Sequence, residues 1–236
     1  MPDIKFGYGD EVTKRFDQEC PFVVVCEGKD DQRFIKEYLK YLSRQGCIDC
    51  KMYKIIKADG VDNIKKDMKN FKLYENYDEM KGFLFISDAD KDGNAAADSF
   101  IDHIGRNWDV KLSREKNMGK DSLGVNIGFY IFPGKDTSDN YLNGALEDLC
   151  VNLLCIEEGT LGLSSLRSSI DSFMDEIVRK RDAPFKSEHK NRLYLFLSST
   201  DKAVGKKIGQ AAKVGAFDFS SPKLAQLKKL ILQMQE

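Results

Sequence analysis

The sequence predicts an α/β fold in which a parallel sheet of about four strands is flanked by helices and followed by a helical C-terminal extension. Two observations support this prediction. Short apolar runs alternate with stretches of helical periodicity up to about residue 156, and beyond residue 159 only helical patterns remain. We therefore expect an α/β domain over residues 1–158 and a helical, basic region over residues 159–236 that packs on it.

Four short apolar runs predict the strands. Each run combines β-branched and aromatic residues, and runs 22–26 and 82–87 are as short and apolar as strands that are buried on both faces of a parallel sheet. The predicted strands are 22–26, 51–57, 82–87 and 125–132.

Apolar residues at helical spacing predict a helix after each strand. Residues 106–124 are rich in Lys, Asn, Ser and Gly, and we expect them to form a mobile loop. Asp92 or Asn94 is expected to cap the third helix. The predicted helices are 30–43, 61–71, 98–104 and 142–156 in the α/β part, and 163–178, 191–199, 204–213 and 223–234 in the C-terminal part.

Composition indicates an ordinary folded chain of 236 residues with 42% hydrophobic residues. No apolar stretch approaches the roughly 20 residues that span a bilayer, and the first residues lack the apolar core of a signal peptide. We therefore expect a cytoplasmic protein without a membrane partner, in which cysteines are reduced.

The six cysteines raise the question of a zinc site. Cys47 and Cys50 have the CxxC spacing of a zinc ligand pair, whereas Cys150 and Cys155 are separated by four residues that read as helix. A structural zinc site needs a second closely spaced pair. Buried or incidental thiols are therefore favoured over zinc.

Charge is distributed unevenly along the chain. Residues 179–236 hold 13 basic and 5 acidic residues, a net charge of +8, and residues 1–178 hold 24 basic and 33 acidic residues, a net charge of −9. This asymmetry suggests an acidic half that binds metal and a basic half that contacts phosphates. Lysines that merely solvate surface helices explain the C-terminal charge equally well.

Acidic residues follow two of the predicted strands directly. Glu27 and Asp31 come after strand 22–26, and Asp88 and Asp90 come after strand 82–87. Ligands in open α/β sheets bind beyond the carboxyl ends of the strands, so these side chains should gather in one cleft. Clustered carboxylates repel one another and remain ionised only with a counter-charge, for which a divalent metal is the simplest source.

Each motif also has a simpler explanation. The segment after strand 22–26 could be a polar turn with Asp30 as a helix N-cap. The segment that begins at Asp88 matches the start of an EF-hand loop, but Ser99 occupies the position of the bidentate Glu and a strand precedes the loop. The same DxD resembles the haloacid-dehalogenase phosphatase motif, but it lacks the usual Thr or Val and lies third in strand order.

The two motifs together resemble the TOPRIM domain, which topoisomerases, bacterial primases, small ribonucleases and OLD (overcoming lysogenization defect) nucleases share. The resemblance covers roughly residues 20–155 and implies a Rossmann-like sheet. Gly144-Ala145-Leu146-Glu147 is similar to an element of the OLD-type branch, whose members also occur as standalone proteins without the ATPase domain. The chain contains no Gly-x-x-x-x-Gly-Lys-Ser/Thr loop, so no nucleotide cofactor is expected.

The resemblance implies metal-dependent cleavage of phosphodiester bonds by two Mg²⁺ or Mn²⁺ ions. Glu27 would be catalytic as well as a metal ligand, and a downstream lysine would stabilise the charge of the transition state. The implied metal ligands are Glu27, Asp31, Asp88, Asp90 and Glu147, with Asp92 and Asp148 supporting them. Lys206 is the first candidate for the lysine, followed by Lys202 and Lys207. The implied phosphate contacts are Arg179, Lys180, Arg181 and Lys207.

The predicted function is therefore that of a metal-dependent nuclease acting on DNA or RNA, of the kind found in prokaryotic defence or DNA repair. A non-catalytic module that binds nucleic acid or regulates a separately encoded ATPase is the alternative, because the Ser-x-Glu element of the OLD pattern cannot be placed. A phosphotransfer enzyme acting on a small substrate is a third option. No tyrosine is set up as a topoisomerase nucleophile, and the zinc ribbon of primases is missing. A homodimer is the default expectation for a soluble protein.

Overall fold

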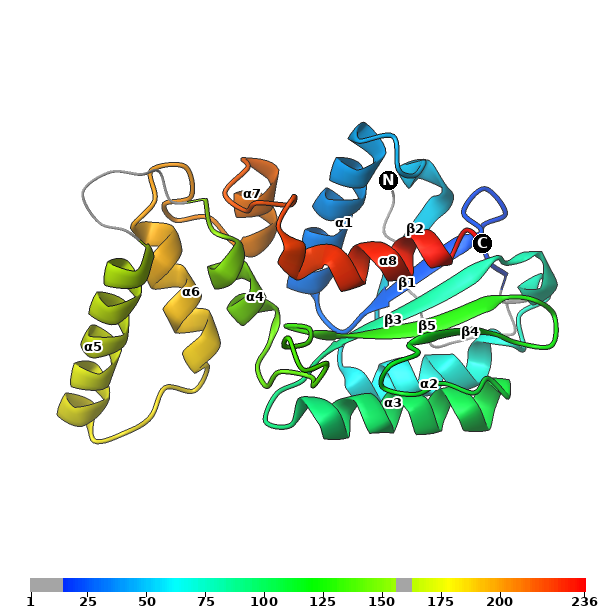
Figure 1. The fold of residues 1–236 in the computed structure, drawn as a ribbon, viewed down its shortest axis with the longest axis horizontal. Coiled ribbons are helices and arrows are strands. Elements are labelled where there is room, and N and C mark those ends of the chain that lie inside the picture. The colour runs from blue at the N-terminus through cyan, green and yellow to red at the C-terminus, as the bar shows by residue number, and fades with distance from the viewer. Residues whose placement is uncertain (1–14, 156–162) are drawn as a thin grey trace.

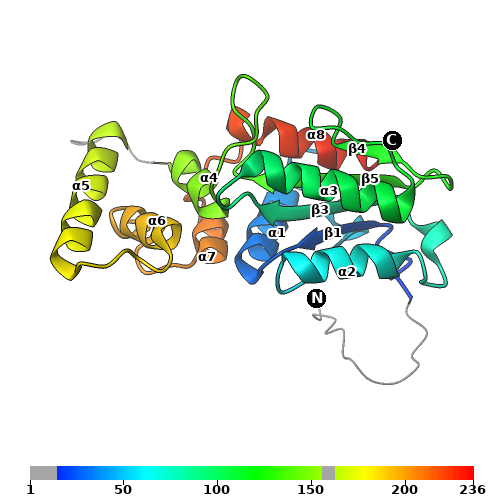
Figure 2. The same ribbon diagram turned by 90° about the horizontal axis from the view of Figure 1, so that it is seen from below.

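The computed structural model describes residues 15–155 and 163–236. Within these residues, five strands form one sheet in the order β2-β1-β3-β5-β4. Helices α1 and α8 cover one face of the sheet, and α2 and α3 cover the other (Figures 1 and 2). The chain is therefore an α/β protein with three layers, as the sequence predicts.

The sheet is parallel except at one edge. Strands β1, β2, β3 and β5 run in the same direction, and β4 pairs with β5 in the antiparallel sense. In the register of the two central strands, Cys26 of β1 lies opposite Ile86 of β3. The residues that follow these strands therefore emerge at the same edge. The strands are β1 (Phe22–Cys26), β2 (Tyr53–Lys57), β3 (Gly82–Asp88), β4 (Met118–Lys120) and β5 (Asn126–Phe132).

Each of the first three parallel strands is followed by a helix, and β5 leads through a loop into α4. Short 3-10 helices occupy Cys50–Met52, Tyr77–Glu79 and Pro222–Leu224. The α-helices are α1 (Lys29–Arg44), α2 (Val61–Phe71), α3 (Gly93–Trp108), α4 (Leu146–Leu153), α5 (Leu163–Arg181), α6 (Glu188–Ser198), α7 (Ile208–Lys213) and α8 (Ala225–Gln233).

Two hydrophobic clusters hold the layers together, and the alternation of side chains along β1 separates them. Val24 faces the cluster that includes residues of α1 and α8, whereas Val23 and Val25 face the cluster formed with α2 and α3. Because all three valines are buried, the strand is apolar on both faces. This explains why it appears as an unbroken apolar run in the sequence.

The C-terminal helices lie in two places. The last helix, α8, returns to the sheet, where the Tyr53 hydroxyl donates to the Ile231 carbonyl at 3.2 Å. By contrast, α5 and α6 pack on each other beyond the end of the sheet, next to α4 (Figure 1). The basic C-terminal part of the chain thus contributes both to the core and to an arm that adjoins one edge of the sheet.

The structure confirms the predicted fold class and differs from the prediction over residues 106–124. Here α3 continues to Trp108, whose buried indole donates to the Met68 carbonyl at 2.7 Å. Residues 118–120 form β4, so the prediction of one mobile loop was wrong in part. A strand of three residues containing a glycine leaves no apolar run in the sequence. Among the described helices, none is long and apolar enough to cross a membrane.

Candidate functional site

The acidic residues after β1 and β3 meet because the two strands are direct neighbours in the sheet. Glu27 follows β1 and reaches the end of β3, where the Ser87 hydroxyl donates to its Oε2 at 2.5 Å. The backbone N–H of Asp88 also approaches this oxygen, at 3.4 Å. The Glu27 carboxylate is therefore held across the carboxyl ends of the two central strands, where α/β sheets bind ligands.

Asp31 is placed by the first turn of α1. Its Oδ2 accepts a hydrogen bond from the backbone N–H of Gly28 at 2.7 Å, which is the pattern of a helix cap. The side chain is buried next to Glu27, and only 7% of the residue is exposed. Capping thus fixes a carboxylate in a position where water cannot fully solvate it.

The third strand and the fourth helix bring two further acids to this edge. The Oδ1 atom of Asp88 accepts a hydrogen bond from the backbone N–H of Leu146 at 2.9 Å. Leu146 is the first residue of α4, and its neighbour Glu147 is buried with 5% exposure. The hydrogen bond therefore ties the N-terminus of α4 to the end of β3. It brings Glu147 to Glu27, Asp31 and Asp88, and these four residues form the acidic cluster.

The loops after β3 and β5 are joined by a pair of backbone hydrogen bonds between Asp90 and Gly144, both of 2.8 Å. Gly144 has a φ of +124°, and a side chain there would collide with the Asp148 carboxylate. Asp148 in turn accepts from the Ala145 N–H at 2.8 Å and so caps α4. Only glycine meets both constraints, which explains the glycine of the Gly-x-Leu-Glu element.

Helix α6 adds two basic groups to the acidic edge. His189 Nδ1 lies 2.7 Å from Asp148 Oδ2, and Lys190 Nζ lies 3.8 Å from Glu147 Oε1. Because these residues are consecutive in α6 and their partners are consecutive in α4, the two contacts dock one helix end on the other. They also place a lysine beside the buried carboxylate of Glu147.

Burial and mutual repulsion dominate the electrostatics of the cluster. Burial raises the pKa of Asp31 to about 6, and the charges of Glu27 and Glu147 add to the rise, against the Gly28 N–H. Burial also raises the pKa of Asp88 well above its usual value, reinforced by Asp31, Glu147 and Glu27. The pKa of Glu147 is likewise raised by burial, although Lys190 opposes the increase. Cations near these acids are therefore strongly favoured.

The donor chemistry of the cluster fits a hard divalent cation, because carboxylate oxygens are the ligands that Mg²⁺ and Mn²⁺ prefer. The hydrogen bonds to Asp31 and Asp88 each use one oxygen, which leaves the other for a cation. Within residues 15–155 and 163–236, however, no group of three or more His, Cys, Asp or Glu side chains is already arranged to hold a metal ion. The carboxylates approach one another without forming a closed ligand set.

Three other predicted acids occupy different positions. Asp90 lies on the loop joined to Gly144, and its exposed side chain is not among the carboxylates that act most strongly on Asp88. Asp92 is exposed and caps α3, accepting from the Ala95 N–H at 2.9 Å. Asp148 caps α4 and contacts His189. The structure thus brings Glu27, Asp31, Asp88 and Glu147 together and places these three around them.

The predicted catalytic lysines lie between α6 and α7. Lys207 is the N-cap of α7, and Lys206 precedes it in the chain. Burial raises the pKa of Cys155, and the charge of Lys202 nearby opposes that rise. Within the described parts of the chain, no ion pair joins Lys206 or Lys207 to the acidic cluster, and the lysine that contacts a clustered acid there is Lys190.

The predicted phosphate contacts at the end of α5 are exposed. Lys180 forms an ion pair with Glu176 at 2.6 Å, and the Arg181 guanidinium lies 5.5 Å from the centre of the Phe185 ring. These residues end α5, which packs on α6 beyond the end of the sheet (Figure 1).

Sequence reasoning missed Ser87, Lys190 and the pairing of His189 with Asp148. Ser87 could have been found, because it precedes Asp88 at the end of the strand next to β1. The two residues of α6 have no local signal. They reach the site only because α6 packs on α4, a contact between segments about 40 residues apart in the chain.

A family model matches most of the chain. The family described as "Protein of unknown function (DUF3226)" matches residues 21–235. No curated protein matches the chain. The solved C-terminal region of the Xanthomonas campestris pv. campestris OLD protein is similar, with 12% sequence identity and a TM-score of 0.44, over 91% of this chain and 95% of that one. This likeness is too distant to carry an inference.

Proposed function

The chain belongs to the DUF3226 family, and we propose that it is a divalent-metal-dependent nuclease. The observation that carries the proposal is the meeting of Glu27, Asp31, Asp88 and Glu147 at the carboxyl edge of the sheet. Burial raises the pKa of three of them, Asp31, Asp88 and Glu147. Perturbed acids in such a place are typical of functional sites.

The order of these acids in the chain favours phosphodiester cleavage over other metal chemistry. Glu27-x-x-x-Asp31, Asp88-x-Asp90 and Gly144-x-Leu146-Glu147 resemble the motifs of OLD-type TOPRIM nucleases, as described above. The geometry supports the same grouping, because α1, β3 and α4 each contribute one of the acids whose pKa burial raises. The basic C-terminal part of the chain suits a polyanionic substrate.

Asp31, Asp88 and Glu147 would hold Mg²⁺ or Mn²⁺. Glu27 would serve both as a metal ligand and as a proton acceptor, and Asp90 would complete the set of metal ligands from the loop after β3. The bound metal supplies Lewis-acid activation of water and neutralises charge on the phosphate. Glu27 accepts the hydrogen bonds described above on Oε2, so Oε1 is the atom available to accept a proton from the attacking water.

Lys190 supplies the positive charge next to the reacting phosphate. Its Nζ lies 3.8 Å from Glu147, and the side chain is 55% exposed, so the ammonium group can turn from the carboxylate towards a substrate. A cation fixed where charge develops stabilises the transition state. Lys206 and Lys202 remain candidates for the same role from the loop before α7.

The test is an assay for nucleic-acid cleavage with supercoiled plasmid, linear duplex, single-stranded DNA and RNA in Mg²⁺, Mn²⁺ or EDTA. We expect cleavage that requires metal and is lost in Asp88→Asn and Glu27→Gln. Glu115→Gln is the matched control, because Glu115 is exposed on the loop between α3 and β4. Equal cleavage by the wild-type protein and both site variants would show that another site or a contaminant is responsible.

A non-catalytic module that binds nucleic acid, or regulates a partner such as a separately encoded ATPase, is the second candidate. The observation that favours it is the absence of a closed metal-ligand set among the described residues. This candidate predicts binding without turnover on every substrate and with every metal. Metal titration alone does not separate the two functions, because both proteins could bind Mg²⁺, whereas turnover does.

A further inference from the structure

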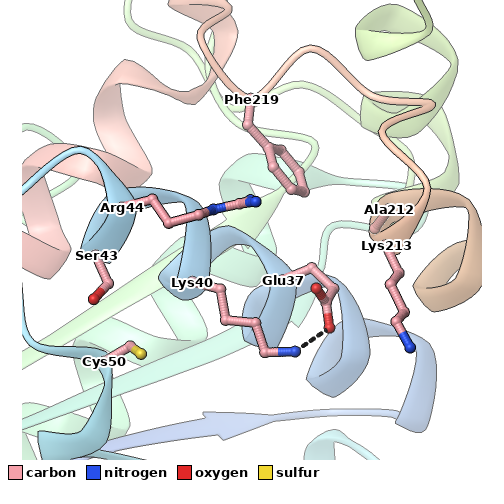
Figure 3. Close-up of a pocket in the computed structure, with 8 residues that line it drawn as sticks. All are labelled: Glu37, Lys40, Ser43, Arg44, Cys50, Ala212, Lys213 and Phe219. Carbon is pink, nitrogen blue, oxygen red and sulfur yellow. Dashed lines mark hydrogen bonds and ion pairs between the residues drawn. The ribbon is translucent and has the colours of Figure 1, made fainter.

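A cavity of about 380 Å³ lies between the second half of α1 and the end of α7 (Figure 3). Lys40, Arg44 and Lys213 line it together with Glu37 and the ring of Phe219. A second cavity of about 440 Å³ shares Arg44, Lys213 and Phe219 with the first, so the two form one groove, named here the α1/α7 groove. Neither cavity is lined by the acidic cluster.

The first cavity has an excess of positive charge. Three cations and one carboxylate line it, and Glu37 is already paired with Lys40 at 2.7 Å. Among the eight residues drawn in Figure 3, the ion pair joins Lys40 to Glu37, and Arg44 and Lys213 form none with the others drawn. The Arg44 guanidinium points towards the ring of Phe219 (Figure 3). Two available cations beside an aromatic ring suit a ligand that carries both phosphate and a planar base.

The groove leads away from the acidic cluster along α1. Gly209 of α7 is so close to Arg33 that an added Cβ would lie 2.5 Å from the Arg33 Cβ, and Lys213 shares the cavity with Lys40 and Arg44. The two helices therefore run in the same direction. Lys207, at the start of α7, lies towards the end of α1 that carries Asp31.

Arg44 lies thirteen positions after Asp31 in α1, which corresponds to about 20 Å along the helix at 1.5 Å per residue. A nucleic-acid strand advances about 3.4 Å per stacked nucleotide. The distance between the acidic cluster and the groove is therefore spanned by about six nucleotides, or fewer if the strand is extended.

We propose that the α1/α7 groove binds a single-stranded segment of the nucleic acid whose scissile phosphate lies at the acidic cluster. This inference rests on the proposed function and specifies its substrate. Arg44 and Lys213 contact backbone phosphates, and Phe219 stacks with a base. A cavity of this size is typical of small-ligand sites and admits an unpaired base, whereas the bases of a duplex are occupied by pairing and stacking.

Phe219 is suited to this role because its position is already fixed. It packs edge-on against Phe34 and Tyr38, with ring centres 5.4 and 5.3 Å apart. A ring held in place loses little freedom when a base stacks on it, and stacking tolerates any base sequence.

The binding experiment uses the Asp88→Asn protein with Mg²⁺, so that cleavage does not interfere, and a fluorescent oligothymidylate of about 15 nucleotides. Replacing Arg44 and Lys213 by alanine should weaken binding about tenfold or more at about 0.1 M salt. The slope of log K against log salt should fall by about 1.4, because each phosphate contact to a single strand contributes about 0.7. Lys65→Ala/Lys69→Ala removes the same charge from α2, on the opposite face of the sheet, and should leave the slope unchanged.

Chain length provides the second readout. The loss caused by the double variant should be seen with the long oligothymidylate and should be absent with one of about three nucleotides held at the acidic cluster. Binding of the long strand with an unchanged affinity and salt slope would overturn the proposal. Displacement of the long strand by thymidine monophosphate at similar affinity would assign the groove to a free nucleotide and overturn the strand path. A duplex that binds as tightly, with the same dependence on Arg44 and Lys213, would overturn the single-strand assignment.

These outcomes are separate from those of the proposed function. Binding that depends on Arg44 and Lys213, together with no metal-dependent cleavage by the wild-type protein, would support strand binding in the α1/α7 groove and contradict the proposed nuclease function. Metal-dependent cleavage, together with binding that does not depend on these two residues, would support the nuclease function and contradict strand binding in the groove.

Discussion

The acidic edge of the sheet and the α1/α7 groove hold charge in opposite ways. At the edge, Asp31, Asp88 and Glu147 are largely buried, and backbone N–H groups fix the first two. In the groove, Arg44 and Lys213 are exposed. The edge therefore stores electrostatic repulsion that a cation can relieve, whereas the groove carries charge at almost no cost to the fold. Substitution of an acid at the edge should therefore lower activity and raise stability, whereas substitution of a cation in the groove should weaken substrate binding and leave stability almost unchanged.

The largest effect is expected from Asp88→Asn. The amide oxygen can still accept the hydrogen bond from Leu146, but the buried charge is lost. We expect cleavage to fall by about a thousandfold. In EDTA at pH 7, the free energy of unfolding should rise, because the penalty for burying the charge and its repulsion from Asp31, Glu147 and Glu27 are relieved.

Urea unfolding in EDTA and an assay of plasmid cleavage measure the two quantities. Glu115→Gln, which removes an exposed carboxylate, should change neither. If Asp88→Asn is less stable than the wild-type protein in EDTA, the edge does not store repulsion and the comparison between the two regions fails.

The pH dependence of stability should reveal the same stored repulsion. Burial raises the pKa of Asp31 from 3.8 in the unfolded chain to about 6 in the folded protein. The folded state therefore binds more protons between these values, so stability is fully present below about pH 4 and falls as pH rises through 6. Asp31 alone contributes at most about 3 kcal/mol to this loss.

Unfolding in EDTA at a series of pH values measures the loss, and added Mg²⁺ should counteract it. A cation that binds only the folded state adds about 2.7 kcal/mol when its concentration is a hundred times its dissociation constant. The stabilisation should be largest above pH 6, where the acids are ionised. Stability that does not change between pH 4 and 7 in EDTA would contradict the burial of ionised acids at this edge.

The two regions also differ in what could be predicted from the sequence. The strands that end at Cys26 and Asp88 appear as unbroken apolar runs because both faces of the sheet are covered, and the acids that follow them meet because parallel neighbours end at one edge. Strand β4 was missed because three residues at an edge bury too little to leave a pattern. Lys190 and the α1/α7 groove were missed because packing between distant helices creates them, and no local spacing records such packing.

A smaller effect is expected from Lys190→Gln, and it tests how the arm contributes to the edge. Glutamine keeps the length of the side chain and removes the charge beside Glu147. Cleavage should fall by about a hundredfold. The docking of α6 on α4 should persist through His189 and the buried residues Leu193 and Phe196.

Lys206→Gln is the matched variant for this experiment, because Lys206 is the lysine that the sequence favours for the same role. Measuring kcat and stability for both variants decides between them. A larger loss of kcat in Lys206→Gln would assign the transition-state charge to the loop before α7 and leave Lys190 a docking role.

The smallest effect on stability is expected from Lys213→Gln in the groove. The side chain is exposed, so the free energy of unfolding should change by no more than about 0.5 kcal/mol at any pH. If the groove binds the strand at a distance from the reacting bond, KM for a long single strand should rise severalfold while kcat stays the same, and the rise should shrink as salt screens the remaining charges. A fall in kcat of the size seen for Lys190→Gln would place Lys213 at the reacting phosphate and merge the two regions into one site.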